Sequence, residues 1–248
     1  MISLYQRYSN ALWLALALLT RLPTPQSGRI EARDSGLSVL FYPLVGLIIG
    51  VILYLPVLVF PDVSALLLSA VIVSLWAIIT GGLHLDGLAD SADAWLGGLG
   101  ERERMQRIMK DPLLGSAGVI AIVCVLILKF AALTSLLQQE KNLAILIAPV
   151  IGRSMILLLF LSTPYVSKQG MASDMVAFLP GKQAYRVLFA SLIPGLIYSF
   201  RGLLLVLIIF WFLRRLMLKL LGGCTGDTLG ASVEISEMMF LLSTALFL

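Results

Sequence analysis

The sequence has few charged residues for its length, and this scarcity excludes an ordinary water-soluble fold. Only 13% of its 248 residues are charged, whereas a typical soluble domain has about 25%. Hydrophobic residues make up 59% of the chain, and the mean hydropathy is +0.98. Apolar runs recur from end to end without a polar block large enough for a soluble core. We therefore predict a single integral membrane domain over residues 1–248.

Histidine and cysteine are also scarce, which excludes several kinds of site. His84 is the only histidine, so a His-rich metal centre is ruled out. The two cysteines, Cys124 in an apolar run and Cys224 in a glycine-rich loop, have neither metal-ligand spacing nor the spacing of a disulfide framework. The net charge of +4 comes from basic residues in short stretches between apolar segments. This pattern is typical of membrane flanks and not of a nucleic-acid binder.

The long apolar segments predict the fold class: an all-α, polytopic transmembrane helical bundle with about seven or eight membrane segments. Each crossing takes about 20 mainly apolar residues, and each must be helical because lipid cannot satisfy free backbone groups. A short amphipathic surface helix is expected over 101–112. Candidate spans lie near 10–22, 37–60, 63–85, 115–137, 143–163, 187–199, 202–218 and 229–248.

Residues 187–218 decide the topology, because they could form one long span or a hairpin of two short ones. A hairpin puts the polar loops near 23–36, 86–114, 164–186 and 219–228 on one side of the membrane, whereas a single span would separate their motifs. Thirteen of the 18 basic residues then lie on that side, which the positive-inside rule assigns to the cytoplasm. We therefore expect the hairpin, with Arg7, Lys141 and Arg201 on the opposite side. The thirteen are Arg21, Arg29, Arg33, Arg102, Arg104, Arg107, Lys110, Lys168, Lys182, Arg186, Arg214, Arg215 and Lys219.

A row of three carboxylates next to a membrane boundary is the first candidate site. Asp86, Asp90 and Asp93 follow an apolar span at spacings of four and three, so on a helix they lie within about 60° of one another. Such a row repels itself unless a cation neutralises it, and oxygen ligands of this kind suit Mg²⁺ bound to substrate phosphates. The alternative is a solvated acidic loop that caps the next helix. His84, two residues before Asp86, is a candidate for proton transfer.

A glycine-rich loop followed by an acidic helix is the second candidate site. Residues 222–230 lead into the last apolar segment, and glycine-rich backbone at a helix N-terminus exposes N–H groups that can hold phosphate oxygens. Asp227 and Glu234 lie seven residues apart, and Glu237 is one turn further, so a stripe of carboxylates enters the membrane. Unpaired charge is costly there, and the stripe needs a metal or an intramembrane cation as its partner. The candidate phosphate-binding positions are Gly223, Thr225 and Gly226.

Basic residues inside the spans and on the surface helix are the candidate partners of these acids and of a phosphate. Lys129 and Arg153 lie within spans, where either could pair with Glu234 or Glu237 as structural glue. Arg153 is also suited to bidentate contact with a phosphate. The surface helix either clamps a diphosphate or lets its basic side chains reach lipid headgroups. Its candidate residues are Arg102, Arg104, Lys110 and Asp111.

In order and spacing, several segments resemble the adenosylcobinamide-GDP ribazoletransferase family, also called cobalamin synthases. The string GLHLDGLAD at 82–90 and the string GGCTGDTLGA at 222–231 are the most specific of them. The resemblance covers nearly the whole chain. The chain departs from the family at Cys224, where Gln is frequent, which leaves the phosphate loop in place. It also departs in the variable 164–186 loop, so specificity for the lower ligand is not carried over. The remaining matches are TRLP at 20–23, residues of 104–115, Gly152-Arg153, Glu234 and Glu237.

The resemblance implies a magnesium-dependent enzyme of the inner membrane with its active site facing the cytoplasm. It would couple adenosylcobinamide-GDP with α-ribazole, or with α-ribazole 5′-phosphate, to give adenosylcobalamin, or its 5′-phosphate, and GMP. Transfer of this kind depends on positioning and charge neutralisation, and two carboxylate clusters could hold Mg²⁺ on the diphosphate. A homo-oligomer is left open. In these roles Asp86, Asp90 and Asp93 would be metal ligands, Asp227 and Glu234 ligands or base, and Arg153 or Arg104 a stabiliser of charge.

Three other functions are compatible with parts of the pattern. A CDP-alcohol phosphotransferase has a D-x-x-D-G-x-x-A-R motif, but Asp90 stands where its Arg would be. A polyprenyl-diphosphate transferase also uses Asp-rich motifs, and it would need a deep apolar channel. A secondary transporter would use the intramembrane charges for substrate or protons, and the inverted repeats that would support it are not visible in the sequence.

Overall fold

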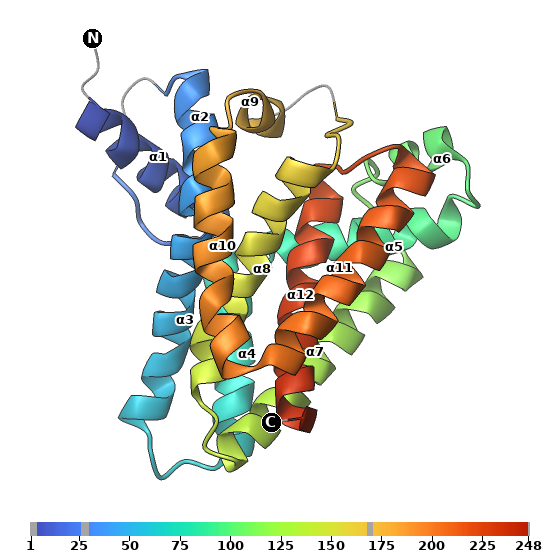
Figure 1. The fold of residues 1–248 in the computed structure, drawn as a ribbon. Coiled ribbons are helices and arrows are strands. Elements are labelled where there is room, and N and C mark those ends of the chain that lie inside the picture. The colour runs from blue at the N-terminus through green and yellow to red at the C-terminus, as the bar shows by residue number, and fades with distance from the viewer. Residues whose placement is uncertain (1–3, 26–29, 168–170, 248) are drawn as a thin grey trace.

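The chain folds into a helical bundle in a computed structural model that describes residues 4–25, 30–167 and 171–247 (Figure 1). Within these residues there is no β-strand, and only an isolated bridge joins Tyr165 to Cys224. The predicted all-α class is confirmed. Arg29 and Lys168, two of the basic residues assigned to the loop-rich side, lie outside the described residues.

Helices follow one another with short connections throughout the described residues. They are α1 (Leu4–Leu19), α2 (Ala32–Ser38), the 3₁₀ turn η1 (Val39–Phe41), α3 (Tyr42–Val59), α4 (Ala65–Thr80), α5 (Leu83–Gly97), α6 (Arg102–Ile108), α7 (Ser116–Gln138), α8 (Leu143–Ser162), α9 (Met171–Ala177), α10 (Gly181–Tyr198), α11 (Phe200–Leu221) and α12 (Gly226–Phe247).

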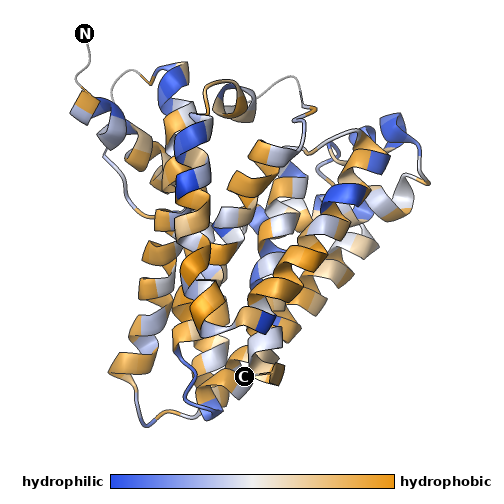
Figure 2. Cartoon of the chain, viewed as in Figure 1, coloured by the Kyte–Doolittle hydropathy of each residue, from blue (hydrophilic) through white to orange (hydrophobic). Residues whose placement is uncertain are grey.

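Four segments of the described chain are long and apolar enough to cross a membrane by themselves. They are Ala32–Val59, which includes α3, and the helices α7, α8 and α12. The bent pair α4 and α5 makes a fifth if it is counted as one span. Apolar residues cover the length of the bundle, and polar residues gather toward the end that carries α2, α6 and α9 (Figure 2). The protein is therefore an integral membrane protein.

Helix α8 is the centre of the bundle and packs against α3, α10 and α12. It approaches α3 closely because Gly46 and Gly50, four residues apart, face it without side chains. A Cβ at Gly46 would lie 2.4 Å from the carbonyl oxygen of Pro149, and one at Gly50 2.6 Å from that of Leu146. Small residues at this spacing let membrane helices approach backbone to backbone.

A break at Ser199 divides residues 187–218 into two helices, as the hairpin prediction requires. The backbone of Ser199 is not helical (φ −147°, ψ 82°), and its hydroxyl accepts a hydrogen bond from the N–H of Gly202 at 3.2 Å. Helix α10 runs away from the end that carries α9, and α11 returns toward α6 (Figure 1). The hairpin is confirmed.

The polar loops meet at one end of the bundle, which we call the loop end. There the N–H of Cys224 donates to the carbonyl of Pro164 at 2.8 Å, and the Arg102 guanidinium lies beside Gly222. Arg7 lies at this end too, because it pairs with Glu31 at 3.0 Å just before α2. The expectation that Arg7 lies on the opposite side is wrong. Helix α1 has 16 residues, about 24 Å, and is too short to cross a hydrocarbon core of about 30 Å.

This topology predicts the accessibility of single cysteines placed at exposed positions in a Cys124→Ser background. Leu113→Cys and Phe178→Cys, both at the loop end, should react with an impermeant maleimide from one face of the membrane. Asp62→Cys and Gln138→Cys, at the opposite turns, should react only from the other face. Labelling of Leu113→Cys and Phe178→Cys from different faces would contradict the shared loop end.

Candidate active site

Two glycines turn the chain from α4 into α5 and so place the acidic row. Gly81 and Gly82 have φ values of 63° and 69°, which glycine adopts without steric cost. The two helices meet at 88°, so α5 leaves the direction of the span. Asp86 and Asp90 therefore stand near the loop end and not along the wall of the bundle.

Helix α5 crosses the first turn of α12 at a glycine on each helix. A Cβ at Gly87 would lie 2.7 Å from the carbonyl oxygen of Asp227, and one at Gly230 would lie 3.1 Å from the Cα of His84. This close approach brings the carboxylate of Asp227 within electrostatic range of Asp86 and Asp90. In the described part of the chain, none of these three acids forms an ion pair. We call Asp86, Asp90 and Asp227 the acidic cluster.

Asp93, the third acid of the row, has backbone partners. Its Oδ2 accepts a hydrogen bond from the N–H of Gly115 at 2.8 Å, and its Oδ1 accepts one from Gly118 at 2.9 Å. These groups belong to the start of α7, where backbone donors have no partner within the helix. Asp93 thus holds the N-terminus of α7, the capping role that was the alternative to metal binding.

Glu234 does not reach the acidic cluster, because a buried cation holds it inside the bundle. The Lys129 ammonium donates to Glu234 Oε2 at 2.7 Å and to Glu237 Oε2 at 2.6 Å. The Arg153 guanidinium donates to the other oxygen of Glu237. These four charges join α7, α8 and α12, and we call them the buried charge network.

The buried charge network also contacts α4 and α5. Lys129 lies 4.3 Å from the centre of the Trp76 ring, a cation–π contact, and Arg153 Nη2 is 3.5 Å from His84 Nδ1. Arg153 is wholly buried. Of the two roles left open for Arg153, the structure shows the intramembrane ion pair.

The glycine-rich loop before α12 is closed by its own hydrogen bonds. The N–H of Thr225 donates to Thr228 Oγ1 at 2.8 Å, and the N–H of Thr228 donates to Thr225 Oγ1 at 3.3 Å. Gly223 is pressed against Pro164, whose carbonyl oxygen lies 2.1 Å from where a Cβ would be. Gly226 is more open, since only the Tyr165 hydroxyl comes within 4.0 Å of such a Cβ. Of the three predicted phosphate-binding positions, Thr225 and Gly226 border a cavity and Gly223 serves packing.

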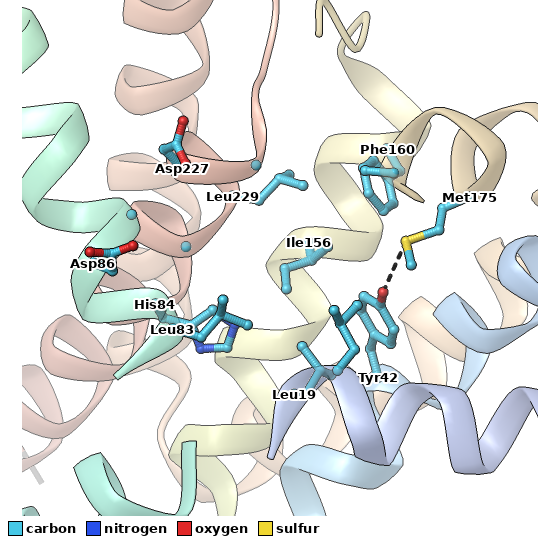
Figure 3. A pocket seen from close by; sticks show the side chains of 15 residues that line it. Leu19, Tyr42, Leu83, His84, Asp86, Ile156, Phe160, Met175, Asp227 and Leu229 are labelled. Carbon is cyan, nitrogen blue, oxygen red and sulfur yellow. Dashed lines mark hydrogen bonds between the residues drawn. The ribbon is translucent and has the colours of Figure 1, made fainter. Parts of the chain in front are cut away.

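Two cavities meet at Gly226 and Asp227. The apolar cavity, of about 230 Å³, has Asp86, His84 and Asp227 on the side of α5 and α12, and Tyr42 and Met175 on the other side (Figure 3). The polar cavity, of about 780 Å³, is bordered by Arg102, Lys110, Tyr165 and Thr225. Asp227 is therefore accessible from both cavities.

The charged residues of α6 and of the segment just after it border two different hollows. Arg102 and Lys110 border the polar cavity, whereas Arg104 and Asp111 border a separate, more open hollow of about 480 Å³ with Arg107. The structure therefore brings two of the four predicted phosphate contacts to Asp227 and leaves the other two on another surface.

Tyr165 borders the polar cavity, and the sequence reasoning did not select it. Its ring makes an edge-on contact with Phe160, 6.2 Å between centroids, and Phe160 borders the apolar cavity. Burial raises the pKa of the Tyr165 phenol, so it is a neutral hydrogen-bonding group. Burial also raises the pKa of the Cys224 thiol to about 12, which keeps that thiol protonated and unreactive. The only sequence signal for Tyr165 is its place directly after a span.

The acidic cluster fits a magnesium ion that arrives with a phosphate ligand. The described residues hold no group of three His, Cys, Asp or Glu side chains arranged to bind a metal. Mg²⁺, however, is usually held by one or two carboxylates together with waters and substrate phosphates. Asp86, Asp90 and Asp227 are oxygen donors that repel one another and have no cationic partner. They match that donor set and do not form a complete cage.

Known proteins resemble the chain over most of its length. The family model described as cobalamin-5-phosphate synthase matches residues 11–245. A Pseudomonas fluorescens protein named adenosylcobinamide-GDP ribazoletransferase is 46% identical over 239 residues, which cover 95% of this chain and 98% of the relative. An Acinetobacter baumannii protein of the same name is 43% identical over 234 residues, 93% of this chain and 95% of the relative. No solved structure matches the chain.

The buried charge network predicts that removing one charge lowers the stability of the protein more than removing two opposite charges. Lys129→Met leaves two carboxylates facing one guanidinium, and we expect it to lower the free energy of unfolding by about 3–5 kcal/mol. Adding Glu234→Gln leaves the neutral pair of Glu237 and Arg153, and should restore part of that loss. Denaturant titration in mixed micelles measures both. Equal stability of Lys129→Met and the unmodified protein would contradict the network.

The close crossing of α5 and α12 predicts that adding one methyl group at Gly87 destabilises the protein. Gly87→Ala pushes a Cβ against the Asp227 backbone, and such overpacking typically costs about 1–3 kcal/mol. Gly181→Ala is the matched control, because no atom lies within 4 Å of its Cβ position. Thermal unfolding in detergent should separate the two variants, and identical midpoints would show that the helices do not approach as described.

Proposed function

The chain belongs to the cobalamin-5-phosphate synthase family, and from this we propose that its adenosylcobinamide-GDP ribazoletransferase reaction takes place where α5 crosses the start of α12. The observation that supports this placement is the position of Asp227, which lies beside Asp86 and borders both cavities. Two substrates bound on either side of Asp227 would meet at its carboxylate. The family assignment also decides against a CDP-alcohol transferase, a polyprenyl-diphosphate transferase and a transporter.

The reaction couples adenosylcobinamide-GDP with α-ribazole and releases GMP. A ribose hydroxyl of α-ribazole attacks the phosphorus atom that carries the cobinamide, and a new phosphorus–oxygen bond forms. The bond from that phosphorus to the bridging oxygen of the diphosphate breaks, the bridging oxygen leaves on GMP, and the hydroxyl proton passes to a base. The products are adenosylcobalamin and GMP, or adenosylcobalamin 5′-phosphate when α-ribazole 5′-phosphate is the acceptor. Such a transfer needs positioning and neutralisation of charge more than covalent help from the protein.

The described side chains divide these tasks between them. Arg102 and Lys110 border the polar cavity and are placed to bind the diphosphate. Asp227 is placed to accept the hydroxyl proton, since it borders the second cavity as well. The Arg153 guanidinium only donates, so it leaves the acceptor role to His84 Nδ1 and the imidazole proton to Nε2. We therefore assign His84 a positioning role and not that of the base.

Asp86 and Asp90 are the residues that would hold magnesium. They are neighbours on one face of α5, and no cation of the described chain pairs with them. A magnesium ion bound there would neutralise charge on the diphosphate as it reacts. Asp93 and Glu234 are left out of this assignment because their oxygens already accept hydrogen bonds from α7 and Lys129.

The site is proposed to face the cytoplasm from the inner membrane. Its support is the charge at the loop end, where Arg102, Lys110 and Arg7 lie together with most of the other basic residues of the chain. Cytoplasmic loops carry such an excess of Lys and Arg. Both substrates would then be taken from, and GMP returned to, the aqueous side that holds nucleotides.

The metal assignment predicts the effect of replacing single carboxylates by amides. Asp86→Asn and Asp90→Asn keep shape and helix-capping ability but remove the charge that binds a hard cation. Each should insert normally and lower GMP release from adenosylcobinamide-GDP and α-ribazole, and each should raise the Mg²⁺ concentration for half-maximal rate. The loss should be at least the roughly 10- to 100-fold that follows removal of an outer partner of a metal site.

The matched control is Asp111→Asn, just after α6, because Asp111 borders the separate hollow and not the polar cavity. It should leave both GMP release and the magnesium titration unchanged. Near-normal release with an unshifted titration in Asp86→Asn and Asp90→Asn would refute the metal site. Absence of GMP release by the unmodified protein in the presence of Mg²⁺ would refute the proposed function itself.

A further inference from the structure

The two cavities that meet at Asp227 differ in chemistry, although they share that residue. The apolar cavity is formed by side chains such as Leu19, Ile156, Phe160 and Met175, and no Lys or Arg is among the described residues that border it. The polar cavity is more than three times as large by volume and contains Arg102 and Lys110. Because of this difference, an apolar group and a charged group of the substrates would bind in different cavities.

A diphosphate does not suit the apolar cavity. A magnesium ion held by Asp86 could meet only part of its charge, because no basic side chain is among the bordering residues, whereas the polar cavity adds Arg102 and Lys110. Burying the remaining charge in an apolar space is expensive. The one hydroxyl opposite the acids, that of Tyr42, is already directed to the Met175 sulfur at 3.2 Å (Figure 3). A corrin macrocycle is excluded by size, because about 230 Å³ is below the usual range for pockets that hold drug-sized ligands.

A flat, neutral aromatic group does suit this cavity. Phe160, Tyr42 and Met175 supply aromatic and thioether surfaces, which make favourable contacts with aromatic rings. Asp86 and Asp227 lie on the facing side, where carboxylates can accept hydrogen bonds from hydroxyl groups attached to such a ring system. These are the two parts of a nucleoside with an uncharged aromatic base.

We propose that the base of the acceptor nucleoside binds in the apolar cavity with its ribose toward Asp86 and Asp227, while the diphosphate of the donor binds in the polar cavity. This inference rests on the proposed function and assigns its two substrates to separate places. The attacking hydroxyl then approaches Asp227 from the apolar cavity, and the reacting phosphorus approaches Asp227 from the polar cavity. Phe160 and Tyr165, in edge-on contact, separate the two binding places.

Variants that narrow one cavity test this assignment through the KM of each substrate. Ala172 and Leu83 border the apolar cavity, and neither is fully buried, so the atoms added by Ala172→Leu and Leu83→Phe can extend into the cavity. Each should raise the KM for α-ribazole about tenfold or more and leave the KM for adenosylcobinamide-GDP within twofold. Arg102→Gln should raise the KM for adenosylcobinamide-GDP and leave the KM for α-ribazole within twofold. Ala177→Leu, an exposed position on the same helix as Ala172, should change neither.

Equilibrium dialysis of α-ribazole alone, without donor or Mg²⁺, separates this inference from the proposed function. The unmodified protein and Ala177→Leu should bind it, and Ala172→Leu and Leu83→Phe should bind it at least about tenfold more weakly. If the unmodified protein releases GMP but the apolar-cavity variants change the KM of the donor, or of neither substrate, the assignment is wrong and the function stands. If it releases no GMP, the function fails, and dialysis still decides whether the cavity binds the nucleoside.

Discussion

The arrangement of this bundle depends on the buried charge network of Lys129, Arg153, Glu234 and Glu237. Two cations and two anions neutralise one another inside the bundle, and removing one would leave a net charge in an apolar interior. Because the four come from α7, α8 and α12, the network fixes how these helices sit along one another. The position of α12 in turn fixes Asp227, which lies on its first turn.

Close helix contacts at glycines bring the residues of the site to α12. Gly46 and Gly50 let α3 lie against α8, and Gly87 lets α5 cross the start of α12 backbone to backbone. The second contact is the one with chemical consequences. It brings Asp86 and Asp90, carried by a helix that has turned by 88° away from α4, to a carboxylate more than 130 positions later in the chain. The acidic cluster is therefore a product of helix packing, although each of its members was visible in the sequence.

Features that leave a local signal were predictable, and pairings between distant segments were not. Hydropathy indicated the long helices, charge bias indicated the break confirmed at Ser199, and one-turn spacing indicated the carboxylates of α5. Nothing local shows that Asp93 holds the start of α7, or that Arg153 faces Glu237 and not a phosphate, because these contacts join residues 22 and 84 positions apart. Arg7 was misplaced for the same reason, since its partner Glu31 is 24 positions away.

The carboxylates of this chain fall into two groups, and their distance from the loop end separates them. Glu234 and Glu237 lie deep along α12, where an acid must be paired, and the buried charge network pairs them. Asp86 and Asp227 border a cavity and Asp90 is partly exposed, and there an acid can remain unpaired until a ligand arrives. A membrane enzyme that handles a diphosphate gains from this division, because the charged part of its chemistry stays at the loop end. Only a neutral group then has to enter the apolar interior, which is the least costly part of either substrate to bury.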